Sequence, residues 1–222
     1  MLTAKELISE NIPIITPLEQ GKTVLNWMEI YKISHLPIVE NNKLIAIIAE
    51  NDIYNTNEPE KPVGDYVFNE NLIYIYEYQH VYDAINIISD NKLTLLPVLD
   101  ENNIYLGSII LQDILPAIKH ITSSDNSGGI IVLEMHPKNY SLTEIANIIE
   151  AEDGKIISLY INNNIKANKL YVNIKINKED LTSIIKSLER YNYKVKVNYC
   201  NNKDDNSMYE DRYNELIHYL NI

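Results

Sequence analysis

Two aspartates, Asp52 and Asp113, are the side chains best placed to bind a ligand in this chain of 222 residues. Each follows an apolar, strand-like segment and precedes a short helical stretch, so the two carboxylates hold equivalent positions. A carboxylate accepts two hydrogen bonds at once, which suits a ligand with paired donors. An acid at this position can equally cap the helix that it opens. Ligand binding and helix capping are therefore both open for these two residues.

Residue types that often perform catalysis occur here without a catalytic arrangement. No histidine pair has metal-ligand spacing, and no cysteine cluster assists. The residues concerned are His35, His80, His120, His136, His218 and the single cysteine, Cys200. The sequence has no Gly-x-Ser-x-Gly elbow, no P-loop and no Gly-x-Gly-x-x-Gly turn. We predict that the chain is not an enzyme, that it has no catalytic or metal site, and that it requires no cofactor.

The composition limits the partners of the chain. Its formal net charge is -12, and an acidic surface repels both phosphate backbones and anionic lipid. We therefore expect no nucleic-acid partner and no membrane partner. No apolar stretch approaches the roughly 20 residues that span a bilayer, and the N-terminus lacks a signal-peptide core. With one cysteine, these features favour a cytoplasmic location.

The first half of the chain contains an internal repeat. Residues 32–39 return as residues 92–99 at an offset of sixty, and Asp52 corresponds to Asp113 at sixty-one. Each copy is predicted to contain a helix, a strand through Leu-Pro, a polar turn, a second strand and a last short helix. The prolines are expected at strand starts, where a missing N–H is tolerated. The two copies are expected to fold against each other.

The order helix, apolar-Leu-Pro, hairpin and then Asp resembles a CBS domain, and it occurs twice. The resemblance implies a tandem CBS pair, or Bateman module, over residues 1–119, with repeats at about 1–56 and 61–119. The polar segment 54–62 would link them. The expected fold class is α/β for this pair and α+β for the remainder.

The resemblance also implies a ligand site. In CBS pairs that bind adenosine nucleotides, the matching Asp binds ribose hydroxyls, and a hydroxyl residue three positions earlier holds phosphate. Here those earlier positions are Ala49 and Ile110, and Glu50 would repel phosphate. An adenosine-type effector is therefore implied, either AMP, S-adenosylmethionine or adenosine, with ATP disfavoured. The implied pocket-lining residues are Ile15, His35, Leu36, Pro37, Ala49, Ile75, Leu95, Leu96, Pro97 and Ile110.

The last third of the chain has a different pattern. Residues 120–129 are polar and are predicted to form a second linker, and residues 130–200 alternate as βαββαβ, a ferredoxin-like order. Ser141 and Glu144 form a capping box before one helix, and Asn177 is expected to cap the next. After a CBS pair, this arrangement resembles an ACT domain. The whole chain resembles the acetoin-utilisation-type CBS–ACT regulatory proteins. The loop 136–140 has no glycine, so an amino-acid effector and ligand-free dimerisation both stay open.

Residues 201–222 begin polar and acidic and then show apolar residues at helical spacing, which predicts an amphipathic helix. It would dock on its own protein, on a dimer mate or on another partner. We expect a homodimeric, non-catalytic regulatory protein that signals to a protein target through dimer or domain rearrangement. The alternative is a ligand-free structural module that acts through dimerisation.

Overall fold

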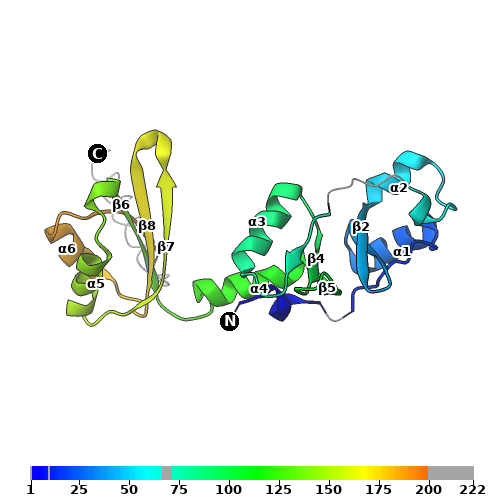
Figure 1. Cartoon of the computed structure of the whole chain (residues 1–222). Coiled ribbons are helices and arrows are strands. Elements are labelled where there is room, and N and C mark those ends of the chain that lie inside the picture. The colour runs from blue at the N-terminus through cyan, green and yellow to red at the C-terminus, as the bar shows by residue number, and fades with distance from the viewer. Residues whose placement is uncertain (1, 10, 67–71, 200–222) are drawn as a thin grey trace, which may run out of the picture. The chain divides into compact units, whose positions relative to one another are not determined.

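The computed structural model describes residues 2–9, 11–66 and 72–199 (Figure 1). The chain divides into two compact units, Met1–Ile118 and Lys119–Ile222. The expected C-terminal helix and Cys200 lie outside the described residues. No described helix is both long enough and apolar enough to cross a membrane.

The first repeat consists of a helix, a β-hairpin and a second helix. These are α1 (Gly21–Tyr31), β1 (His35–Glu40), β2 (Lys43–Ala49) and α2 (Glu50–Thr56). Strands β1 and β2 pair antiparallel. Contrary to expectation, Pro37 is the third residue of β1 and not its start. Its carbonyl accepts from the Ile15 N–H, so the missing N–H of Pro37 faces away from β2 and costs the hairpin no bond.

The second repeat copies this plan and adds a short strand. Its elements are β3 (Ile75–Tyr76), α3 (Val81–Asn91), β4 (Leu95–Leu99), β5 (Tyr105–Ile110) and α4 (Leu111–Thr122). The sheet order is β3-β4-β5, with β3 parallel and β5 antiparallel to β4. Pro97 is likewise the third residue of its strand. Helices α1 and α3 both end at a lysine in the left-handed conformation, Lys32 and Lys92, which shows the repeat at the level of the backbone.

The leading segment of each repeat pairs with the other repeat. The segment around η1 (Ala4–Leu7) donates from the backbone N–H groups of Ala4 and Lys5 to the carbonyls of Gln79 and Glu77. In the opposite direction, the segment before and within η2 (Val63–Asp65) contacts the start of α1. There the Val63 N–H donates to the Glu19 carbonyl and the Gly64 N–H to the Pro17 carbonyl, both at 2.8 Å. The repeats are thus interlocked, an exchange that the sequence repeat did not predict.

The apolar core is shared between the repeats, as the repeat pattern predicted. Leu95 of β4 is fully buried and belongs to the core of the first repeat, together with Ile15, Leu36 and Ile48. A smaller cluster joins Val39 and Leu44 of the first hairpin to Leu99 of the second repeat. Neither repeat buries these surfaces alone, so the pair is the folding unit.

The second unit has the ferredoxin-like order that the sequence predicted. Its elements are β6 (Gly129–Met135), η3 (Pro137–Asn139), α5 (Leu142–Ala151), β7 (Ile156–Asn164), η4 (Ile165–Ala167), β8 (Lys169–Ile176), α6 (Thr182–Arg190) and β9 (Lys194–Tyr199). The sheet is antiparallel, in the order β7-β8-β6-β9. Both helices cover one face of it, where Leu133 and Ile174 pack against Ile145 and Ile184 (Figure 1).

Two local expectations for this region need correction. Helix α4 continues to Thr122 and β6 begins at Gly129, so the connecting segment is shorter than the predicted 120–129. Asn177 does not cap α6, because its side-chain oxygen accepts from the Lys155 N–H at 2.7 Å. The Thr182 N–H at the start of α6 donates to Asp180 instead. The Ser141 cap of α5 is confirmed, since its hydroxyl accepts from the Glu144 N–H.

Candidate functional site

Asp113 lies in the first turn of α4 and is half-buried. The Ser9 hydroxyl donates a hydrogen bond to its Oδ2 atom. Ser9 belongs to the leading segment that crosses to the second repeat, and its N–H donates to the Ser108 carbonyl on β5 at 2.9 Å. Gly107 lies against the Ile8 side chain, where a Cβ atom would collide. The fold thus brings a hydroxyl of one repeat to the carboxylate of the other.

Asp52 has a different environment. It is exposed on α2, and its Oδ2 atom accepts from the Ala49 N–H at 2.8 Å. This contact is half of a capping box, because Ala49 has no hydroxyl with which to return the bond. The capping interpretation therefore accounts for Asp52 as it stands. The two aspartates are equivalent in sequence but not in their partners.

His35 and Thr94 join the two repeats through hydrogen bonds. The Thr94 N–H and hydroxyl both lie against the His35 Nδ1 atom, at 3.2 and 2.9 Å, and the Ser34 N–H donates to the Thr94 hydroxyl oxygen at 2.9 Å. Burial lowers the pKa of His35, while the negative charge of Asp52 acts in the opposite direction. A neutral imidazole whose Nδ1 accepts satisfies both Thr94 contacts.

The other predicted lining residues divide into buried and accessible groups. Five of them are fully buried core residues, namely Ile15, Leu36, Ile75, Leu95 and Leu96. Pro37 and Pro97 are also buried within their strands. His35, Ala49 and Ile110 keep partial exposure. These three, with the two aspartates, are the predicted residues that a ligand can reach without displacing the core.

A surface groove of about 730 Å³ follows α1 and the start of α2. Its lining includes Lys22 and Lys32, but also Glu29, Glu50 and Tyr54. The Glu50 carboxylate, 3.3 Å from the Tyr54 hydroxyl, raises the pKa of Tyr54, with smaller contributions from burial and from Glu29. The side of this groove next to α2 therefore carries negative charge that opposes phosphate.

The loop 136–140, which the ACT resemblance marked as a possible effector site, has a histidine whose two ring nitrogens both contact groups of the chain itself. The His136 Nδ1 atom accepts from the Lys138 N–H, and its Nε2 atom lies 2.9 Å from the Asn168 amide nitrogen. Among the described residues, no group of three histidine, cysteine, aspartate or glutamate side chains is arranged to hold a metal ion.

Two contact residues, Ser9 and Thr94, were missed by reasoning from sequence. The sequence could have indicated Thr94, because this residue aligns with Ser34 at the repeat offset of sixty. No sequence pattern indicated Ser9, since its contact with Asp113 depends on the exchange of leading segments between the repeats. That exchange is a property of tertiary structure and leaves no pattern in either repeat.

Residues 4–56 and 63–120 match the model of the CBS domain family, and together they make up half of the chain. The chain therefore belongs to the CBS domain family and contains a CBS pair, the kind of module that serves regulation. Inosine-5'-monophosphate dehydrogenase of Methanocaldococcus jannaschii is 27% identical over 150 residues, which is 67% of this chain and 30% of that enzyme. The Aquifex aeolicus enzyme is 32% identical over 142 residues, 62% of this chain and 29% of the enzyme. The chain thus spans less than a third of the length of these relatives.

Solved structures of CBS pairs are also similar. A CBS domain pair/ACT domain protein from Thermotoga maritima has a TM-score of 0.48 at 17% identity, covering 53% of this chain and 97% of that chain. CBSX2 in complex with AMP has a TM-score of 0.45 at 19% identity, with 54% and 97% covered. The CBS pair of protein MJ0100, in complex with 5'-methylthioadenosine and S-adenosyl-L-methionine, has 0.45 at 22% identity, with 53% and 96% covered.

Proposed function

We propose that this protein is a regulatory sensor that binds an adenosine-type ligand at Asp113. The observation that carries the proposal is the hydrogen bond from the Ser9 hydroxyl to the Asp113 carboxylate. This contact marks a position where a hydroxyl donor fits the acid, and a ribose hydroxyl is a chemically equivalent donor. The second oxygen of the carboxylate would accept the neighbouring hydroxyl of a ribose diol.

The residues around the two acids favour the second repeat. Asp52 is engaged by the Ala49 N–H and follows Glu50, whereas Leu111 and Gln112 precede Asp113 without charge. Ala49 and Ile110 stand where a hydroxyl would hold phosphate. The preferred ligand is therefore adenosine or S-adenosylmethionine, with AMP weaker and ATP weakest.

The charge of the first unit supports the proposed choice of partners. Residues 1–118 contain 17 acidic and 6 basic side chains, which disfavours contact with nucleic acid or anionic membrane. We infer a cytoplasmic homodimer that passes the ligand signal to a protein target. The signal requires a ligand that binds two arrangements of the protein with different affinity. The ACT-like region, residues 130–200, would receive it.

Isothermal titration calorimetry with adenosine, S-adenosylmethionine, AMP and ATP tests the proposal. We expect adenosine and S-adenosylmethionine to bind more tightly than AMP, and ATP to bind most weakly, and we expect Asp113→Ala to lower affinity at least tenfold. Asp100→Ala, which removes an acid from a turn of the same repeat, is the matched control. If the control variant loses as much affinity as Asp113→Ala, Asp113 is not the ligand acid.

One observation favours a second function, a CBS pair without ligand that serves dimerisation. Both acids already have partners within the chain, Ser9 for Asp113 and the Ala49 N–H for Asp52. On this alternative, none of the four compounds raises the melting temperature, and Asp113→Ala alters only stability. Sedimentation would then give the same dimer for the wild type and for the variant.

A further inference from the structure

The sheet of the second unit has an outer face that points away from α5 and α6. Residues alternate along β6, so Ile131 and Leu133 enter the core, whereas Ile130, Val132 and Glu134 face outward. The three outward residues are half-buried. Their neighbours on β8 and β9 continue them sideways, so the outer face consists of rows of side chains two residues apart along the strands.

One end of this outer face is covered by the chain's own connecting segment. The ammonium of Lys175 on β8, which is buried, donates to the Ser123 carbonyl at 2.5 Å. Lys175 pairs with Ile130, so the segment between α4 and β6 lies against the Ile130 end of the face. The opposite end, around Glu134, carries the exposed charged side chains.

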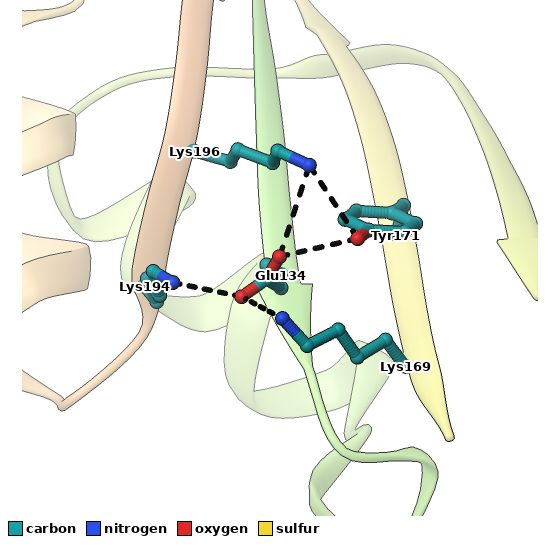
Figure 2. A network of polar contacts seen from close by, with 5 residues as sticks. All are labelled: Glu134, Lys169, Tyr171, Lys194 and Lys196. Carbon is teal, nitrogen blue, oxygen red and sulfur yellow. Dashed lines mark hydrogen bonds and ion pairs between the residues drawn. The ribbon is translucent and has the colours of Figure 1, made fainter. Parts of the chain in front are cut away.

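Three lysines surround the Glu134 carboxylate. Glu134 points into a group formed by Lys169, Lys194, Lys196 and Tyr171 (Figure 2). The Lys194 and Lys169 ammonium groups lie 2.8 and 3.0 Å from its Oε1 atom, and the Lys196 ammonium lies 3.8 Å from Oε2. We call the three lysines the lysine cluster. Three ammonium groups face one carboxylate, so the cluster has two positive charges in excess.

A β-bulge adds the third lysine to this group. Val195 and Val197 of β9 pair with adjacent residues of β6, so Lys196 between them is the extra residue of the bulge. Val195 packs toward the core, whereas Val197 lies opposite the outward Val132. The bulge therefore inserts one more outward side chain, a lysine, between the Glu134 row and the Val132 row.

The lysine cluster keeps donors for a further anion. The Lys196 ammonium lies beyond hydrogen-bonding distance from Glu134 and donates instead to the Tyr171 hydroxyl at 3.4 Å. An ammonium has three donors, so one such bond leaves two of them. The side chains of Lys169, Lys194 and Lys196 are 45, 68 and 47% exposed. A second carboxylate can therefore bind without displacing Glu134.

An apolar strip forms the next row of the outer face. Val132 pairs with Val197 on β9 and with Asn173 on β8, and Asn173 pairs in turn with Tyr160 on β7. Cross-strand partners lie on the same face of a sheet, so these residues form one row. Tyr160 is 52% exposed. The outer face thus presents an apolar strip beside an excess of lysine charge, in a protein whose net charge is -12.

We propose that this part of the outer face binds an extended acidic segment of a protein partner, with an acid at the lysine cluster and an apolar side chain on the strip. The rows of Glu134 and Val132 are two residues apart, about 6.8 Å along the strand. An extended peptide repeats the side chains of one side at the same spacing. A segment with the pattern acid-x-apolar that lies along the strands therefore meets both rows in register.

Charge selects this partner over a second copy of the same face. Two copies that met through the outer face would bring two lysine clusters together, and the contact would be repulsive. The acidic segment would belong to the protein target of the proposed sensor, so the meaning of the contact rests on that function. Peptide binding is measured without a ligand at Asp113, so either proposal can fail alone.

An NMR titration of the full chain with a synthetic peptide tests the proposal. The probe is acetylated and amidated Ser-Glu-Ser-Glu-Ser-Leu-Ser, and its matched control has glutamine in place of each glutamate. We expect the acidic peptide to bind about fivefold more tightly. We also expect it to shift the amide signals of β6 and β9 around Glu134 and Val132. Equal affinity of the two peptides, or no saturable binding, would overturn the proposal.

Charge variants locate the contact. Lys196→Gln leaves both hydrogen-bonded lysines on Glu134 and should weaken binding severalfold, and Lys194→Gln with Lys196→Gln should weaken it further. Glu134→Gln removes the competing carboxylate and should tighten binding. Lys155→Gln with Lys186→Gln, at exposed positions away from the outer face, should leave affinity unchanged. An equal loss in that control would show a general charge effect and contradict the proposed contact.

Two other outcomes would assign the lysines a different role. Unchanged peptide affinity in both lysine variants would mean that the bulge and its lysines serve only to protect an edge strand from pairing with other chains. Vesicles that contain phosphatidylserine test an anionic lipid surface. Tighter binding to these vesicles than to the acidic peptide would make the partner a membrane and would overturn the proposal.

Discussion

The Ser9 hydroxyl donates to the Asp113 carboxylate across 104 positions of sequence. Ser9 is also fixed by its N–H, which donates to the Ser108 carbonyl of β5. A ligand that binds Asp113 through its own hydroxyls must therefore displace the Ser9 side chain. Ligand binding at Asp113 is therefore linked to the position of the leading segment. The ligand binds the arrangement in which Ser9 is displaced and not the one in which Ser9 bonds to Asp113.

Replacing Ser9 by Ala should strengthen ligand binding. The substitution removes the internal competitor, and a hydrogen bond to a charged group contributes about 1.5 kcal/mol, so we expect about tenfold tighter binding of adenosine or S-adenosylmethionine. Calorimetry measures it. Ser124→Ala, at an exposed serine, serves as the control. Weaker binding by Ser9→Ala would mean that Ser9 contacts the ligand and does not compete with it.

Replacing Asp52 by Ala should affect stability and leave ligand affinity unchanged. The variant loses the contact with the Ala49 N–H, and loss of a helix N-terminal cap costs about 1 kcal/mol. Urea unfolding measures the loss, with Asn51→Ala on the same exposed turn as its control. A fall in ligand affinity that exceeds the effect on folding would instead make Asp52 part of the binding site.

Most of the fold could be predicted from sequence because it depends on local pattern. The repeat around Pro37 and Pro97 predicted both hairpins, and the alternation from Leu170 to Ile176 predicted a buried strand face, which the structure confirms. The position of Asp113 was also predicted, but its partner was not. Ser9 reaches Asp113 only through the exchange of leading segments, and no local pattern encodes a contact between distant segments.

Asn177 shows the same limit on a smaller scale. Asparagine before an apolar helical stripe is a reasonable cap, yet its side chain accepts from the Lys155 N–H on a neighbouring turn. The two groups are 22 residues apart in sequence. Side-chain hydrogen bonds at helix starts compete with such tertiary contacts, and only the folded arrangement decides between them.

His35 should make the first unit less stable at mildly acidic pH. Burial lowers the pKa of His35 in the folded protein below its ordinary value of 6.5, so the unfolded chain binds the proton more readily. The stabilising contribution is complete above pH 6.5 and is lost as the pH falls below it. His35→Leu, which copies Leu95 of the second repeat, should flatten the pH dependence of urea unfolding below pH 6.5. An unchanged slope would show that another group causes the effect.

Glu134 should stabilise the second unit chiefly by neutralising the lysine cluster. Hydrogen bonds from Lys194 and Lys169 lower the pKa of Glu134 to about 2, with burial acting against them and Tyr171 adding a further bond. Its ordinary value is 4.5, so the unfolded chain takes up the proton first as the pH falls. The stabilisation is therefore complete above pH 4.5 and is lost progressively toward pH 2.

Glu134→Gln tests this contribution, because it keeps the shape of the side chain and removes its charge. The three ammonium groups then repel one another, and we expect a lower melting temperature at pH 7 that high salt partly restores, since salt screens repulsion between exposed charges. Near pH 2, where wild-type Glu134 is about half protonated, the difference between the two proteins should be much smaller. Glu144→Gln, at an acid that accepts a hydrogen bond from the Tyr193 hydroxyl, is the comparison because no lysine pairs with it in the described part of the chain. A salt-independent loss in Glu134→Gln would indicate a packing defect and not lysine repulsion.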